Sequence, residues 1–300
     1  MTSREQDFTI GQPTVTGPLA LIPIFGPSPT FMYRSFARAV DAGAYATELP
    51  TGPAVRSVRV ENPTSVPALT YTGQEIVGAK QNRIFDATTL VPAGEGVDLP
   101  VSCVERGRWA LFGEAGRFEP GQSVADPALR WSRHANRSGE PALDQLEVWT
   151  EVDARLATHQ ATSPSSSLSA AYEHRRDEIS SLVGGLAPLP DQVGVVACVG
   201  GAPVAVDLVS RPEVLADLFP ALAHGYALQA LGARAADADE EAVGILVAEA
   251  IMAPRYELPT QGLGTAFGVK STLSVGSGLE HAGELIQLSA FPRGRKPDMM

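Results

Sequence analysis

The sequence predicts an α+β protein whose first half is β-rich and sandwich-like and whose second half combines helices with a mainly antiparallel sheet. In the first 105 residues, many short apolar segments are separated by glycine- and proline-containing turns, as in antiparallel sheets. After about residue 140, apolar residues recur at three- and four-residue steps, which indicates helices. We therefore expect a β-rich module at 1–138 and an α+β module at 139–300, packed as one compact unit.

The first half contains one predicted helix, residues 35–44, which ends at Gly43. Pro23 interrupts the first apolar run and favours an edge strand there. Val58 and Val60 alternate with polar residues, so this segment should be a half-exposed strand. The predicted strand segments are 19–25, 54–62, 68–78 (two strands around Thr72 and Gly73), 84–91 and 97–105.

The second half alternates helices with hairpins. Ser210 and Glu213 have the spacing of a capping box, and Pro220 should kink or divide the helix that follows. Gly200 and Gly201 supply the positive φ of a tight hairpin turn. The predicted helices are 141–159, 168–183, 210–231 and 239–252; the predicted strands form a hairpin at 192–209 and two final strands at 265–278 and 283–291, followed by a frayed tail at 293–300.

The net charge of −11 and the pI near 4.9 argue against non-specific binding to nucleic acid, since an acidic surface repels phosphates. Residues 105–137 are locally basic, with six arginines against four acids. This stretch can either receive a small anion or form ion pairs within the protein. The arginines are Arg106, Arg108, Arg117, Arg130, Arg133 and Arg137.

The cysteines, Cys103 and Cys198, form no disulfide framework and no metal-ligand pattern. The five histidines lack ligand spacing, so we expect no structural zinc. The N-terminus lacks the features of a signal peptide, and the longest charge-free apolar window, 193–206, is too short to cross a bilayer. These features predict a cytoplasmic protein that does not interact with membranes.

The segment GQEIVGAKQNRIF (73–85) places an unusual set of polar residues after a short strand. Lysine offers a point charge, the amides donate and accept, and arginine presents a planar fork, which together suit a phosphate or carboxylate on a sugar or base. The alternative is that Glu75 pairs with a nearby cation to hold a turn. The candidates are Glu75 and Lys80 for catalysis and Gln81, Asn82 and Arg83 for ligand binding.

A second candidate segment, PVSCVERGRW (100–109), also ends a predicted strand. Glu105 suits acid–base work as a partner of Glu75, while Arg108 and Trp109 can clamp a phosphate and stack on a base. Cys103 is either a nucleophile, and so part of a ligand site, or a buried strand residue. In the helix at 168–183, His174 is a catalytic candidate and Arg175 a ligand-binding one, against the alternative of a solvated helix face.

Several of these stretches resemble one bacterial family, whose name describes association with ADP-ribosylglycohydrolases and rhodanese-phosphatases. The resemblance covers nearly the whole chain in the same order. It implies a context of NAD and ADP-ribose processing and no specific reaction. It is carried by 73–85, by LVPAG (90–94), by LPVSCVERGRW (99–109), by LDQLEVWTEV (143–152) and by AAYEHRRDEI (170–179).

Two functions remain open at this point. The first is the binding or processing of a small nucleotide-like anion linked to NAD or ADP-ribose metabolism, at a polar site on the β-rich half, with no cofactor indicated. The second is a non-catalytic assembly module, with a homo-oligomer as its expected form. The dinucleotide fingerprint, the P-loop and the nucleophile elbow are all absent from the sequence.

Overall fold

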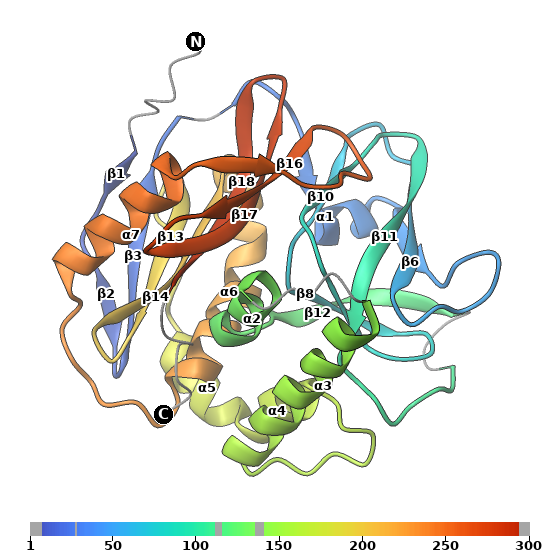
Figure 1. Cartoon of the computed structure of the whole chain (residues 1–300), viewed down its shortest axis with the longest axis horizontal. Coiled ribbons are helices and arrows are strands. Elements are labelled where there is room, and N and C mark those ends of the chain that lie inside the picture. The colour runs from blue at the N-terminus through green and yellow to red at the C-terminus, as the bar shows by residue number, and fades with distance from the viewer. Residues whose placement is uncertain (1–7, 28, 112–115, 136–140, 294–300) are drawn as a thin grey trace.

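The computed structural model describes residues 8–27, 29–111, 116–135 and 141–293, and it confirms the α+β class (Figure 1). The expected tail at 293–300 lies, except for Arg293, outside the described residues. The helices are α1 (Phe36–Asp41), α2 (Pro127–Ala135), α3 (Pro141–Thr158), α4 (Ser169–His174), α5 (Arg176–Val183), α6 (Pro212–Ala230) and α7 (Glu240–Met252). None of them, within the described part of the chain, is long and apolar enough to cross a membrane.

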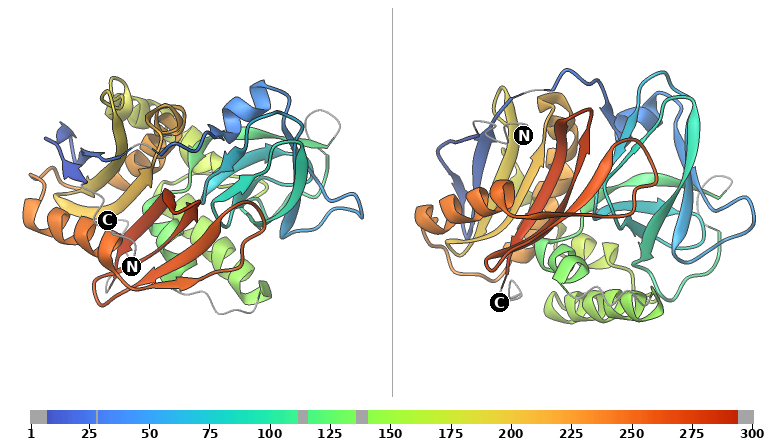
Figure 2. Two further views of the ribbon diagram at one scale, coloured as in Figure 1. Left: turned by 90° about the horizontal axis from the view of Figure 1, so that it is seen from above. Right: turned by 45° about the horizontal axis from the view of Figure 1, so that its top comes forward.

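A large antiparallel sheet occupies one side of the molecule (Figures 1 and 2). Because its residues alternate between two faces, Val195 and Ala197 pack with α6, whereas Val196 and Cys198 pack with α7. The order is β1 (Thr9–Ile10), β3 (Leu19–Phe25), β13 (Gln192–Val199), β14 (Ala202–Val209), β18 (Glu284–Pro292), β17 (Ser274–His281), β16 (Thr265–Lys270) and β15 (Arg255–Glu257), with β2 (Thr14–Thr16) also paired to β3.

Pro23 favoured an edge strand, but β3 lies inside the large sheet. It pairs with β13 along its length, and two short strands cover its other side. β2 ends its pairing at Leu21 and β1 begins at Ile24, so Pro23 falls in the gap between them. Its missing N–H therefore interrupts no ladder.

The rest of the first half forms a closed six-stranded barrel, where the pattern had suggested a sandwich-like module. Phe36, Phe85 and Phe118 fill its core together with alternating valines. The barrel order is β11 (Glu95–Cys103), β6 (Ser57–Asn62), β5 (Tyr45–Thr47), β12 (Arg117–Val124), β8 (Gln74–Gly78) and β9 (Arg83–Phe85); a small sheet holds β10 (Thr89–Val91), β7 (Ala68–Thr70) and β4 (Arg34–Ser35). The division near residue 138 stays a prediction, and strands β1 to β3 join the large sheet.

Three local expectations for the second half were wrong. The predicted helix at 168–183 is divided into α4 and α5 at Arg175, whose φ of −104° and ψ of 19° depart from helical values. Helix α6 is not divided at Pro220, where a kink stays a prediction, and its N-cap is Arg211 in place of Ser210, with no side-chain cap. The segment 265–278 holds two strands, because the side chain of Ser271 accepts hydrogen bonds from the backbone of Leu273 and Ser274 in a turn.

Most arginines of the basic stretch form ion pairs within the protein. Arg130 of α2 contacts Asp207 of β14 at 2.7 and 2.9 Å, and the hydroxyl of Tyr71 donates to the same carboxylate. This fully buried group links the segment after β7 to the large sheet. Further pairs are Arg106–Asp153, Arg108–Glu105 and Arg133–Asp86, while Arg137 lies outside the described residues.

Candidate functional site

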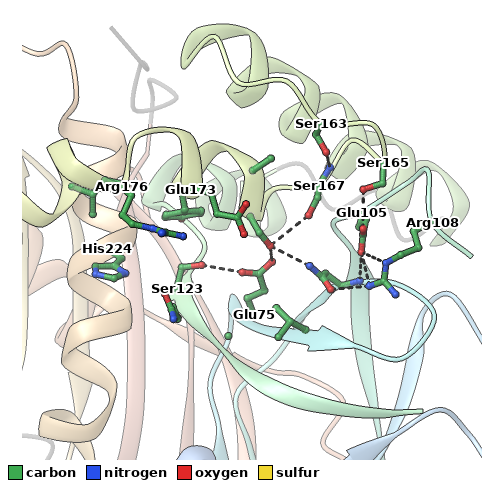
Figure 3. A pocket seen from close by; sticks show the side chains of 18 of the residues that line it. Glu75, Glu105, Arg108, Ser123, Ser163, Ser165, Ser167, Glu173, Arg176 and His224 are labelled. Atoms are coloured by element: carbon green, nitrogen blue, oxygen red, sulfur yellow. Dashed lines mark hydrogen bonds and ion pairs between the residues drawn. The ribbon is translucent and has the colours of Figure 1, made fainter. Parts of the chain in front are cut away.

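A cavity of about 660 Å³ lies where the barrel meets the helices of the second half (Figure 3). Strands β8 and β12 form one wall, the serine-rich segment 162–169 and helices α4 and α5 form another, and α6 contributes His224. The charged or titratable side chains that line it are Glu75, Glu105, Arg108, Tyr172, Glu173, Arg176 and His224.

Glu75 lies opposite an irregularity in the barrel. Strand β12 pairs with β8 at Pro120 and again at Val124, so three residues of β12 bulge out opposite Glu75. A Cβ on Gly121 would come within 2.9 Å of the Cβ and the backbone oxygen of Glu75, so only glycine fits this close approach. The bulge brings the hydroxyl of Ser123 to the Glu75 carboxylate.

The Glu75 carboxylate is buried, and its hydrogen-bond partners within the described residues are uncharged hydroxyl groups. Ser169 donates to Oε1 at 2.7 Å and Ser123 donates to Oε2 at 3.1 Å. The pKa of Glu75 is raised to about 7, mainly by burial. The hydrogen bonds from the two serines oppose this rise, and the charges of Glu105 and Glu173 contribute to it. Glu75 can therefore gain or lose a proton near neutral pH.

The second carboxylate of the cavity, Glu105, follows the end of β11 and is held by a cation. Arg108 donates from Nε to Oε2 at 2.9 Å, the backbone N–H of Asn82 donates at 3.0 Å, and Ser165 donates to Oε1 at 2.8 Å. Burial alone would raise the pKa of Glu105, but the hydrogen bonds and the Arg108 charge lower it below its usual value. Glu105 therefore stays ionised in the pH range near 7 in which Glu75 titrates.

Asn82 connects the two carboxylates. Its backbone binds Glu105, its side-chain oxygen accepts from Arg108 at 3.0 Å, and its amide donates to Ser169 at 3.1 Å. Ser169 in turn donates to Glu75. A continuous hydrogen-bonded path therefore runs from Glu105 through Asn82 and Ser169 to Glu75. Figure 3 labels the two carboxylates at its ends.

The serine-rich segment reaches the cavity because it lies against the chain that follows β11. Gly107 donates to the Ser165 carbonyl at 2.7 Å, Leu168 donates to the Val104 carbonyl at 2.9 Å, and Glu105 and Ser167 form a β-bridge. Leu168 is buried in the core. The hydroxyl-bearing residues that line the cavity from this segment are Thr162, Ser163, Ser165, Ser167 and Ser169.

In the view of Figure 3, Arg176 and His224 lie toward one end of the cavity, Glu105 and Arg108 toward the other, and Glu75 between them. Within the described residues, the Arg176 side chain has no hydrogen bond or ion pair. Glu173 of α4 and Arg176 of α5 form no ion pair with each other within the described residues. Burial lowers the pKa of His224, and a hydrogen bond with the Gln122 backbone opposes this.

The structure brings four of the predicted site residues to this cavity: Glu75, Asn82, Glu105 and Arg108. Three others from the 73–85 segment do not line it. Arg83 lies inside the barrel, where it donates to both oxygens of Glu48 at 3.1 and 3.2 Å. Gln81 is buried beside Cys103, and Lys80 binds Glu48 through its backbone N–H at 3.2 Å.

The remaining predicted residues also lie outside the cavity. Burial raises the pKa of the Cys103 thiol, whose backbone is held by Gln145, so this cysteine is a poor nucleophile. Trp109 and His174 are exposed and do not line the cavity, and Arg175 pairs with Glu178.

Sequence reasoning missed the serines, Arg176 and His224. The serines do carry a sequence signal: TSPSSSLS (162–169) holds five serines in eight residues, just after the predicted helix 141–159. No comparable signal marked Arg176 or His224, which come from helices far apart in the sequence.

The geometry favours proton transfer to a bound molecule. One carboxylate titrates near neutrality and the other stays charged, a division typical of acid–base sites. Among the described residues, no three His, Cys, Asp or Glu side chains gather in a way that could hold a metal ion.

The fold and the cavity define an α+β protein with a polar pocket between a small barrel and the helices of the second half. Over residues 7–291 the sequence matches the ARG and Rhodanese-Phosphatase-superfamily-associated Protein domain, and the chain belongs to this family. Searches of curated proteins and of solved structures found no match.

Proposed function

We propose that this protein binds a small nucleotide-like anion in the cavity and processes it by acid–base chemistry, with Glu75 as the proton-carrying group. The observation that carries the proposal is the placement of Glu75. Among the described residues, this buried carboxylate is held only by serine hydroxyls, and its pKa is raised to about 7. Perturbed carboxylates in cavities are typical of acid–base sites.

Glu105 has a different role in this proposal. Both of its oxygens already accept hydrogen bonds, so it is a fixed negative charge that orients Arg108 and Asn82. Asn82 then orients Ser169 against Glu75. Glu105 is a positioning residue, and Glu75 is the group that contacts the bound molecule.

The chemical class of the ligand follows from the lining. A volume of about 660 Å³ lies within the usual range for small-molecule sites. The row of hydroxyls suits a molecule with many polar groups, and Arg176 supplies a positive charge for an anion. The family description, which links the domain to ADP-ribosylglycohydrolase-associated proteins, supports NAD or ADP-ribose derivatives as the first ligands to test.

Calorimetry and product chromatography with NAD, ADP-ribose and related nucleotides test this function. We expect saturable binding of at least one of them and its conversion. The variant Glu75→Gln should bind the same molecule but convert it about 10²- to 10⁴-fold more slowly, since the proton carrier is lost. The control is Glu119→Gln, an exposed carboxylate on β12 outside the cavity, which should behave as the wild type.

The absence of saturable binding across these nucleotides would overturn the proposal. The alternative, a non-catalytic assembly module, would then be favoured if the protein forms a defined oligomer in light-scattering measurements. Homo-oligomerisation itself remains a prediction.

A further inference from the structure

The two ends of the cavity differ in how far their polar groups are already engaged. At one end, Arg108 donates to Glu105, to Asn82 and to the carbonyl oxygen of Ala79. At the other end, the side chains of Arg176 and Ser180 of α5 and of Gln122 of β12 have no hydrogen bond within the described residues. These groups remain available to a ligand.

The charges of the cavity differ in the same way. The positive charge of Arg108 is offset by Glu105 at 2.6 Å, whereas Arg176 has no ion pair within the described residues. Glu173 also lines the cavity, and because Glu173 and Arg176 are both exposed, water screens the repulsion by the one and the attraction by the other alike. Of the two arginines that line the cavity, Arg176 is therefore the one without an ion pair among the described residues.

We propose that the Arg176 end of the cavity, with Gln122 and Ser180, binds a phosphate ester group of the ligand. A guanidinium presents several N–H donors in one plane, and the amide and hydroxyl add donors from other directions. A tetrahedral phosphate, with oxygens that point in several directions, uses such a set more fully than a planar carboxylate.

The hydroxyl-bearing part of the same ligand then lies along the serine segment, next to Glu75. Serine hydroxyls and carboxylates are common partners of sugar hydroxyls. This inference rests on the proposed function, because it gives the direction in which the ligand lies across the same cavity.

Calorimetry with AMP, adenosine and the 5′-carboxylate analogue of adenosine tests the phosphate end separately from any reaction. The wild type should bind AMP at least about tenfold more tightly than adenosine, with the carboxylate analogue between them. Arg176→Ala should weaken AMP binding by at least about tenfold and leave adenosine binding unchanged. The matched control is Arg175→Ala, which removes the neighbouring arginine, paired with Glu178 and outside the cavity.

Wild-type affinity of Arg176→Ala for AMP would overturn the inference, and so would a failure of AMP to bind the wild type. If NAD or ADP-ribose is still converted in either case, the proposed function stands and only the phosphate end is wrong. If AMP binds through Arg176 but no nucleotide is converted, the phosphate end stands and the acid–base function fails.

Discussion

The core between barrel and sheet and the cavity beside it both contain buried carboxylates, and the two regions neutralise them differently. In the core, Asp207 contacts Arg130 and Asp126 contacts Arg155, with all four side chains buried. Burial alone would raise the pKa of each aspartate, but the arginine charges and hydrogen bonds lower it below its usual value. In the cavity, Glu75 has only serine hydroxyls as hydrogen-bond partners within the described residues, and burial raises its pKa.

An arginine accompanies each buried carboxylate that holds other groups in place, namely Asp207 and Asp126 in the core and Glu105 in the cavity. Tyr71, Tyr226 and Ser289 add hydroxyl donors to Asp207, so that group joins several elements. Leaving Glu75 without a cation costs stability at neutral pH, and such a cost is typical of functional sites.

The largest effect is expected from breaking a core pair. Arg130→Met leaves Asp207 buried without its cation, which should lower the free energy of unfolding by about 3–5 kcal/mol, measured by urea denaturation. Arg175→Ala, which removes a largely exposed pair with Glu178, should cost about 0–1 kcal/mol. Equal effects of the two substitutions would contradict the structural role of the core pair.

The pH dependence of stability should set Glu75 apart from the core aspartates. Its folded-state pKa, about 7, lies above the unfolded value of 4.5, so the folded protein binds the extra proton between these values. Protonation of Glu75 therefore adds about 3 kcal/mol to the free energy of unfolding. This contribution is complete below about pH 4.5 and is lost as the pH rises through 7.

Urea denaturation of wild type and Glu75→Gln between pH 5 and 8 measures this contribution. The difference between the two proteins isolates Glu75 from His159 and His224, whose lowered pKa values give the opposite slope in the same range. Parallel stability curves for the two proteins would show that Glu75 does not titrate near neutrality.

The sequence alone located the half of the cavity that comes from neighbouring strands. The two candidate segments, 73–85 and 100–109, contain four of the residues that line the cavity: Glu75, Asn82, Glu105 and Arg108. The pairing of β8, β9 and β11 brings the two segments together. Arg83 looked equivalent to Arg108 in the sequence. It lies inside the barrel instead, bound to Glu48, whereas its neighbour Asn82 reaches the cavity, because successive strand residues point to opposite faces.

The other half of the cavity could not be predicted from local patterns. Ser169, Arg176 and His224 come from segments after residue 160, and no periodicity relates them to the barrel strands. The fold class was predictable because strand and helix periods are local, whereas barrel closure depends on pairs such as β5 with β12, about 70 residues apart.

The smallest effect on activity is expected at Cys103, which shares the burial of the core groups and does not line the cavity. Its thiol donates to Gln81 at 3.2 Å, and burial keeps it protonated by raising its pKa. Cys103→Ala should therefore convert the ligand at a rate within about twofold of the wild type and lose about 1 kcal/mol of stability, from the small space it leaves. Turnover and urea denaturation measure the two quantities. A hundredfold slower reaction in a protein of unchanged stability would instead make Cys103 the nucleophile and move the chemistry away from Glu75.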